Sequence, residues 1–327
     1  MKVIHWTAFN SSGMNRVAES IHHAELAAGI DSHLCNCQTP PADNYASILD
    51  ADIHVTHTHF PEDVRRRLTN KSYKWVWVGH GTPEHTFAHS VEDGLRGGYG
   101  HGDSWMLLQY ALQHADASVV FWPRHHQIFK SLADKHTPIH LVPLGVDKTF
   151  WCPGESNGKF AGSPSLFTAE NCHQIKWPLD LFITWPFVYP HVPGNACLHS
   201  AYLPLDQHRW FFPLLNRNGA SYAMHLTNGA FAHPALRNVF RSVDFYIGLV
   251  RYGDFNRISL EANATGCKTI SYRGNPFSDY WLTEGDQRVI AQELIEILSG
   301  RVPPRDKSVV PDVVETSKAI IDVYNSL

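Results

Sequence analysis

One carboxylate, Glu261, stands in the segment of the chain whose pattern most suggests ligand chemistry. An apolar run at 244–250 leads through a loop at 251–256 into a helical stretch that carries Glu261, and a small-residue turn and a second apolar run follow. An ionised carboxylate only accepts hydrogen bonds, and a helix N-terminus favours an anion. This segment therefore predicts a polar ligand site, and the alternative is an ordinary helix with a solvated glutamate.

Histidine is the second residue type that could do chemistry, since the chain contains 22 of them. In the segment HVTHTHF, strand alternation places His57 and His59 on one face, which is the arrangement of a metal-ligand pair. The sequence identifies no third ligand, so we expect polar or buried neutral histidines and no metal. Another histidine, His80, directly follows the apolar run Val76–Gly79.

Basic residues cluster in one place, between Arg65 and Lys74. Acidic residues stand beside this run at Glu62 and Asp63, which favours a solvated helix face. The alternative is a surface for an anionic acceptor, such as a nucleic acid with a hydroxylated base or a phospholipid headgroup.

Composition excludes several classes of protein. The chain has 327 residues, a net charge of −4 and 43% hydrophobic residues, so it is neither disordered nor a generally basic nucleic-acid or membrane binder. Its six cysteines form no C-x-x-C pair, which is typical of free thiols in a reducing compartment. No signal-peptide pattern opens the chain, and no run approaches the roughly 18 apolar residues of a membrane helix. We expect a cytoplasmic protein with no transmembrane segment.

The elements that must position these residues follow from the alternation of short apolar runs with helical spacing, which is typical of βαβ units and parallel sheets. In the first half we expect strands at Val3–Trp6, Ile30–Cys35, Ile53–His57, Trp75–Gly79, Ser118–Phe121 and Ile139–Val142, and helices at Met14–Ala28, Trp105–His114 and His126–Lys135. In the second half we expect strands at Ser165–Ala169, Ala196–Ala201, Phe245–Leu249 and Thr269–Tyr272, and helices at Pro178–Thr184, Ala235–Ser242, Ile258–Thr265, Gln287–Leu298 and Val313–Tyr324.

A stretch dense in glycine and proline, Pro143–Gly158, divides the two halves. We therefore expect an α/β protein with two doubly wound, Rossmann-like domains at 1–150 and 151–310 that face a central ligand cleft. We also expect a C-terminal helix at 311–327, which can pack against the first domain.

Two motifs carry a resemblance to a known family. Glu261–Gly266 reads E-A-N-A-T-G, and Pro143–Asp147 reads P-L-G-V-D with Phe150 and Pro153 behind it. Both resemble segments of the retaining GT-B glycosyltransferases of the GT4-type, glycogen-synthase-like group. The first is similar to the family's E-A-x-A-x-G helix, and the second to its interdomain motif.

The resemblance implies roles for individual residues. It implies that Glu261 accepts hydrogen bonds from the ribose of a nucleotide, that His80 approaches the donor sugar, and that Gly13 belongs to a glycine loop facing the donor phosphates. It also implies that the loop HLTNG packs on the nucleobase. The implied catalytic residues are His80, Lys176, Arg251 and Asp254, and the implied donor-binding residues are Gly13, Thr227, Asn228, Asn256, Arg257 and Glu261.

The chain departs from the family's pattern at two positions. Gly253 stands where the family has a glutamate that touches the donor sugar, and Asp254 is the nearest carboxylate. Asn171 stands where the family has a phosphate-binding arginine, although Lys176 matches the lysine. Either Arg251 or Arg257 is placed to replace the missing arginine.

The resemblance thus implies a retaining transfer of a sugar from a nucleotide-diphosphate sugar to a hydroxyl acceptor, with no metal or other cofactor. The acceptor is a glycan, a small molecule, a lipid or a hydroxylated nucleic-acid base. Two alternatives stay open, because the two departures also suit a non-catalytic nucleotide-sugar-binding protein, and the same fold serves non-hydrolysing sugar-nucleotide epimerases.

Overall fold

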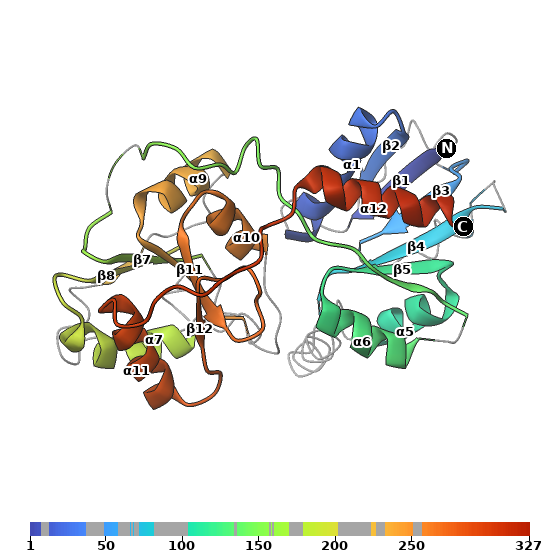
Figure 1. Ribbon diagram of the computed structural model, residues 1–327. Coiled ribbons are helices and arrows are strands. Elements are labelled where there is room, and N and C mark those ends of the chain that lie inside the picture. Colours follow the sequence, from blue (N-terminus) through green and yellow to red (C-terminus); the bar gives the residue numbers. More distant parts are fainter. Residues whose placement is uncertain are drawn as a thin grey trace. The chain divides into compact units, whose positions relative to one another are not determined.

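A computed structural model gives the protein's fold (Figure 1). It describes residues 1–7, 13–36, 49–57, 66, 68, 72–81, 104–133, 136–156, 158, 160–169, 179–201, 224–226, 233–250 and 257–327. Two compact units make up the chain: unit 1 combines 1–147 with 311–327, and unit 2 spans 148–310.

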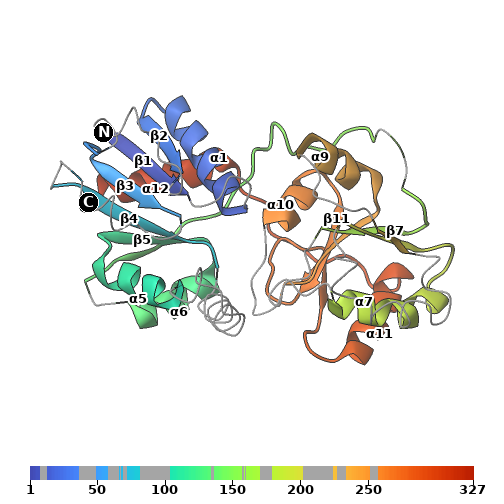
Figure 2. The same ribbon diagram turned by 180° about the vertical axis from the view of Figure 1, so that it is seen from behind.

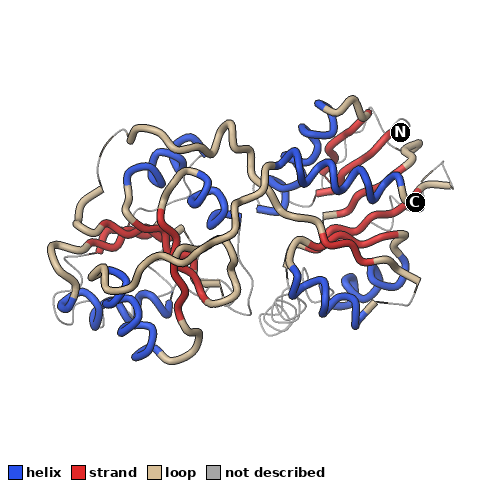
Figure 3. The backbone as a smooth tube through the Cα atoms, viewed as in Figure 1, coloured by secondary structure: helices blue, strands red, loops and turns tan. Residues whose placement is uncertain are grey.

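Unit 1 is built on a six-stranded parallel sheet in the order β2-β1-β3-β4-β5-β6 (Figure 3). Because β1 pairs with both β2 and β3, the strand order reverses at the β1/β3 boundary, and ligands of such sheets bind at the carboxyl ends there. The strands are β1 (Lys2–Thr7), β2 (Asp31–Asn36), β3 (Ile53–Thr56), β4 (Lys74–Gly79), β5 (Ala117–Val120) and β6 (Ile139–Leu141).

Helices cover both faces of this sheet. The helices are α1 (Gly13–Ala27), α5 (Ser104–His114), α6 (Pro123–Leu132) and α12 (Val313–Asn325). Ile4 and Trp6 of β1 join one apolar core with Leu108 of α5 and Phe129 of α6. His5, between them on the same strand, points to the opposite face, where α1 and α12 pack against each other (Figures 1 and 2).

The P-L-G-V-D motif contacts the segment at residues 311–316, where the chain re-enters unit 1 after unit 2. Val146 pairs with Asp312 in a parallel bridge, and the Gly145 N–H donates to Thr316 Oγ1 at 2.8 Å. Thr316 Oγ1 in turn donates to the Pro143 carbonyl at 2.8 Å. A Cβ atom on Gly145 would lie 2.2 Å from the backbone oxygen of Asp312, so the motif needs a glycine for this close approach.

Unit 2 is built on a second parallel six-stranded sheet, in the order β12-β11-β10-β7-β8-β9. This is the doubly wound order, and its direction reverses between β7 and β10. The strands are β7 (Ser165–Thr168), β8 (Cys197–Ser200), β9 (Met224–Leu226), β10 (Phe245–Gly248), β11 (Lys268–Tyr272) and β12 (Tyr280–Leu282). The helices are α7 (Leu179–Val188), α9 (His233–Ser242), α10 (Arg257–Ala264) and α11 (Gln287–Leu298), and a 3-10 turn (Tyr189–His191) follows α7.

The predicted pair of doubly wound sheets is confirmed, with differences at some elements. Helix α6 begins at Pro123, not at His126, because a proline suits the first turn of a helix. Helix α7 continues past Thr184 to Val188, because Trp185 and Val188 extend its fully buried face. Strands β9 and β12, of three residues each, were not predicted.

Within the part of the chain that the structure describes, none of the helices is both long and apolar enough to cross a membrane.

The close approach at Gly145 predicts the effect of a side chain there. We expect Gly145→Ala to lower the free energy of unfolding by about 1–3 kcal/mol, because the added methyl must displace the backbone of residue 312. Urea unfolding measures this, with Gly158→Ala as the matched control, since a Cβ atom at Gly158 meets nothing within 4 Å. Equal urea midpoints for the two variants would show that the backbone at residue 312 shifts at little cost in free energy.

Burial of His54 predicts a loss of stability in acid. Trp6 Nε1 donates to His54 Nδ1 at 3.0 Å, and burial lowers the pKa of His54 from 6.5 to about 4. The unfolded chain therefore binds a proton near pH 6 that the folded chain does not bind. We expect stability to fall by on the order of 3 kcal/mol from this group between pH 7 and pH 4. His54→Gln should flatten the pH dependence of urea unfolding, and an unchanged slope would contradict this assignment.

Candidate active site

Helix α10 places Glu261 and Arg257 together in unit 2. The helix follows β10, the strand that borders the reversal in strand order. Arg257 is its first residue, and its Nε–H donates to Glu261 Oε1 one turn later at 2.8 Å. The side chains of Arg257 and Glu261 are only 11% and 4% exposed, so the pair is largely withdrawn from water. A buried carboxylate needs such a partner, since removing one charge of a buried pair costs about 3–5 kcal/mol.

The rest of the E-A-N-A-T-G motif is explained by the fold. Gly266 has φ +87°, and Cys267 N–H and Gly266 N–H donate to the carbonyls of Ala262 and Asn263, which is the pattern of a Schellman cap. Ala262 is fully buried in the packing of α10. Asn263 Nδ2 donates to the Phe277 carbonyl at 2.7 Å. Ala262, Asn263 and Gly266 thus serve the packing and the cap of α10, and Glu261 is the ionisable residue of the motif.

In unit 1, His80 directly follows β4 and heads a chain of buried side chains. Its Nε2 lies 2.9 Å from Nδ1 of His57, and Nε2 of His57 lies 3.0 Å from Nδ1 of His5. The other nitrogen of His5, Nε2, lies 2.7 Å from Glu25 Oε2. His5, His57 and His80 come from or directly follow three strands that lie next to one another in the sheet.

Glu25, on α1, ends this chain in a fully buried position. Ser32 Oγ donates to its Oε2 at 2.6 Å, and the Tyr324 hydroxyl of α12 donates to its Oε1 at 2.9 Å. Burial acts to raise the pKa of Glu25, but His5 and the hydrogen bonds from His5, Ser32 and Tyr324 outweigh it and hold that pKa below its ordinary value. Glu25 is therefore an ionised carboxylate at neutral pH.

His57 and Tyr324 carry opposite pKa shifts. Burial, with His80 and His5 beside it, lowers the pKa of His57 well below its ordinary value. Burial and the neighbouring Glu25 raise the pKa of Tyr324 well above its ordinary value. Both His57 and Tyr324 are therefore neutral at pH 7.

The described residues hold no group of three or more histidine, cysteine, aspartate or glutamate side chains that is arranged for a metal. Both ring nitrogens of His57 bond to other histidines. Its expected partner in a metal pair, His59, lies outside the described residues.

The remaining predicted positions are only partly described. Gly13 is the first residue of α1, which follows β1 at the reversal in strand order. Lys74, which ends the basic run Arg65–Lys74, is the first residue of β4, and its Nζ lies 3.1 Å from Asp116 Oδ1. Outside the described residues lie Lys176, Arg251, Asp254, Thr227, Asn228 and Asn256, together with the departures at Asn171 and Gly253.

Sequence reasoning missed His5, Glu25 and Tyr324. A signal was present in two of them, since His5 interrupts an apolar strand and Glu25 stands four residues after the buried Ile21, on the same face of α1. Nothing in the sequence linked Tyr324 to Glu25 across 299 positions.

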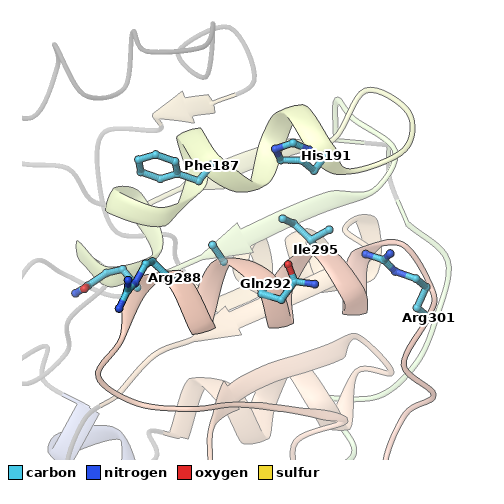
Figure 4. A pocket seen from close by; sticks show the side chains of 8 residues that line it. Phe187, His191, Arg288, Gln292, Ile295 and Arg301 are labelled. Carbon is cyan, nitrogen blue, oxygen red and sulfur yellow. The ribbon is translucent and has the colours of Figure 1, made fainter.

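A separate groove of about 570 Å³ lies between α7 and α11 in unit 2 (Figure 4). Phe187 and His191 line one side, and Arg288 and Arg301 lie on the other. It is formed by the helix layer and contains none of the predicted site residues, so it does not bear on their chemistry.

No family model matches the sequence, and no curated protein matches it. Solved structures do match over the whole length. Sucrose-phosphate synthase from Thermosynechococcus elongatus superposes with a TM-score of 0.68 at 12% identity, covering 99% of this chain and 95% of that one. Anabaena HepE, solved with UDP-glucose, gives 0.66 at 13% identity and covers all of both chains. An α-glucosyltransferase solved with UDP and a 13-mer DNA containing an A:G mismatch gives 0.63 at 13% identity, covering 99% and 100%.

These matches confirm, at the level of the fold, the resemblance that the two motifs indicate. Over its full length the chain has the GT-B fold of the retaining, GT4-type glycosyltransferases.

Proposed function

We propose that the protein is a retaining glycosyltransferase that moves a sugar from a nucleotide-diphosphate sugar to a hydroxyl acceptor. The observation that carries this proposal is the buried Arg257–Glu261 pair in α10. The Glu261 side chain is only 4% exposed and pairs with Arg257, and it lies beside the reversal in strand order where doubly wound sheets bind ligands.

Each member of the site has a proposed role. Glu261 accepts hydrogen bonds from the ribose hydroxyls, and Arg257, at the N-terminus of α10, holds it and adds positive charge toward the diphosphate. Gly13, Thr227, Asn228 and Asn256 complete donor binding, and His80 and Asp254 contact the sugar.

The mechanism proposed is front-face transfer without an enzymatic nucleophile. Negative charge develops on the departing diphosphate, so fixed cations such as Lys176 and Arg251 supply most of the catalysis. Holding the acceptor hydroxyl beside the anomeric carbon supplies the rest.

The relatives suggest where to begin with substrates. HepE and the α-glucosyltransferase were solved with uridine diphosphate compounds, so UDP-sugars are the first donors to test. The second was also solved with DNA, which supports including DNA among the acceptors and agrees with an anionic acceptor near Arg65–Lys74.

Donor binding tests the role of Glu261. We expect one class among UDP-, GDP-, ADP- and TDP-sugars to raise the melting temperature and to be slowly hydrolysed. Glu261→Gln keeps an oxygen for Arg257 but loses the charge, so it should weaken donor binding about 10- to 100-fold. The control is Glu293→Gln on α11, where the carboxylate accepts from the Thr283 N–H at 2.6 Å inside unit 2.

The results separate the alternatives. Binding without hydrolysis or transfer to any acceptor, including DNA, would favour the non-catalytic nucleotide-sugar-binding protein that Gly253 and Asn171 also suit. Interconversion of two donor sugars would favour an epimerase. If no donor binds, the protein shares only the fold.

Removing a diphosphate cation tests the electrostatic mechanism. We expect Lys176→Ala to lower the rate of donor hydrolysis about 10²- to 10³-fold at saturating donor, as loss of one preorganised charge stabiliser does elsewhere. Lys268→Ala is the control, because Lys268 starts β11 at the amino ends of the strands. Equal rates for the two variants would remove Lys176 from the site.

A further inference from the structure

The groove on unit 2 follows α11 along its length (Figure 4). The residues of α11 that line it lie along one side of the helix, and they are Gln287, Arg288, Ala291, Gln292 and Ile295. Because α11 has 12 residues, it is about 18 Å long, which is the length of about three turns of another helix.

Apolar side chains line the middle of this groove. Ala291 and Ile295 belong to α11, and Phe187 belongs to α7. Phe187 is 44% exposed, and it is the one aromatic among the exposed large apolar side chains of the described residues. Exposed apolar surface that polar residues surround is typical of an interaction site, and aromatic side chains are frequent anchors of such sites.

Two arginines stand at opposite ends of the groove (Figure 4). Arg288 already pairs with Asp286, since its Nη2 lies 3.0 Å from Oδ2 of that residue. Arg301 makes no ion pair with any residue that the structure describes. No acidic side chain is among the described residues that line the groove. The Arg301 end is therefore complementary to a negative charge on whatever binds there.

Other kinds of occupant fit these observations less well. A second copy that presented the same groove would bring arginines against arginines. Anionic membranes are bound by clusters of about 4–8 basic residues, whereas two arginines line this groove. A membrane surface is also flat, and the apolar residues here lie in a recess between two helices.

We propose that this groove is a docking site for an amphipathic helix of a partner protein. The helix places apolar side chains from one of its faces against Phe187, Ala291 and Ile295, and it places acidic side chains in the turn that meets Arg301. An apolar helix face laid into a groove is a recurring mode of recognition, and the charge fixes which end of the helix meets Arg301.

A library of helical peptides displayed on phage tests this chemistry. The peptides have about 18 residues, long enough to form a helix, with leucines fixed along one face and the other positions free. They are selected on the full-length protein, and those that also bind Ile295→Asp are removed. We expect the selected peptides to carry aspartate or glutamate concentrated in one terminal turn.

Fluorescence anisotropy of a selected peptide then tests the two parts of the site. We expect Arg301→Glu and Ile295→Asp each to weaken binding about tenfold or more. Val289→Glu is the matched control, because Val289 is 39% exposed on the same helix and does not line the groove. Its affinity should equal that of the wild type.

Exchange of the charges separates a direct contact from damage to the fold. A peptide whose acidic residues are replaced by lysine should bind Arg301→Glu about tenfold more tightly than it binds the wild type. A misfolded variant would bind neither peptide, so a gain of affinity identifies the pairing.

The proposal is overturned if no peptide is selected, if the selected peptides lack acidic residues, or if Arg301→Glu binds them as the wild type does. Two further results would assign the groove to another occupant. One is binding of vesicles of phosphatidylserine and phosphatidylcholine that Ile295→Asp abolishes, and the other is self-association in sedimentation that the same variant abolishes. None of these measurements uses a nucleotide sugar, so the outcome is independent of the proposed function.

Discussion

A buried carboxylate must be surrounded by donors, and Glu25 shows how much structure this constraint organises. Withdrawing an ionised carboxylate from water costs several kcal/mol unless hydrogen bonds replace the lost solvation. Here the donors come from β1, β2 and α12, so the charge ties the first helix to two strands and to the C-terminal helix. The same bonds orient a row of histidines that runs to the carboxyl edge of the sheet.

Two buried carboxylates of unit 2, Asp180 and Glu261, meet this constraint in different ways. Asp180 of α7 accepts from the Tyr272 hydroxyl on β11 and from Gln287 of α11, so its donors are distant in sequence and its role is to join elements. Glu261 is paired with Arg257, one turn earlier in the same helix. Asp180 therefore joins α7 to β11 and α11, whereas Glu261 lies in the motif that resembles the glycosyltransferases, and we propose a ligand role for it.

Much of the fold was predictable because its signals are local. Apolar runs, helical spacing and the glycine- and proline-rich break predicted both doubly wound sheets, and the Gln287–Leu298 helix agrees at both ends. The motif residues Gly145 and Gly266 were recognised from sequence, and the structure gives the physical reason for each: a backbone contact with residue 312 and a left-handed helix cap. Short strands such as β9 escaped prediction, since pairing with neighbours and not composition makes them strands.

The same distinction, between local signals and contacts of distant segments, applies to the candidate site. The sequence by itself determined that Glu261 lies in a helix that follows a buried strand, with Arg257 just before the predicted start of that helix, and that His80 follows another strand, because these relations need only local periodicity. Only the tertiary structure decided that His5, His57 and His80 form one chain and that Glu25 and Tyr324 close it. Those contacts join residues 20 to 299 positions apart, and strand order and helix packing bring them together, which no local pattern encodes.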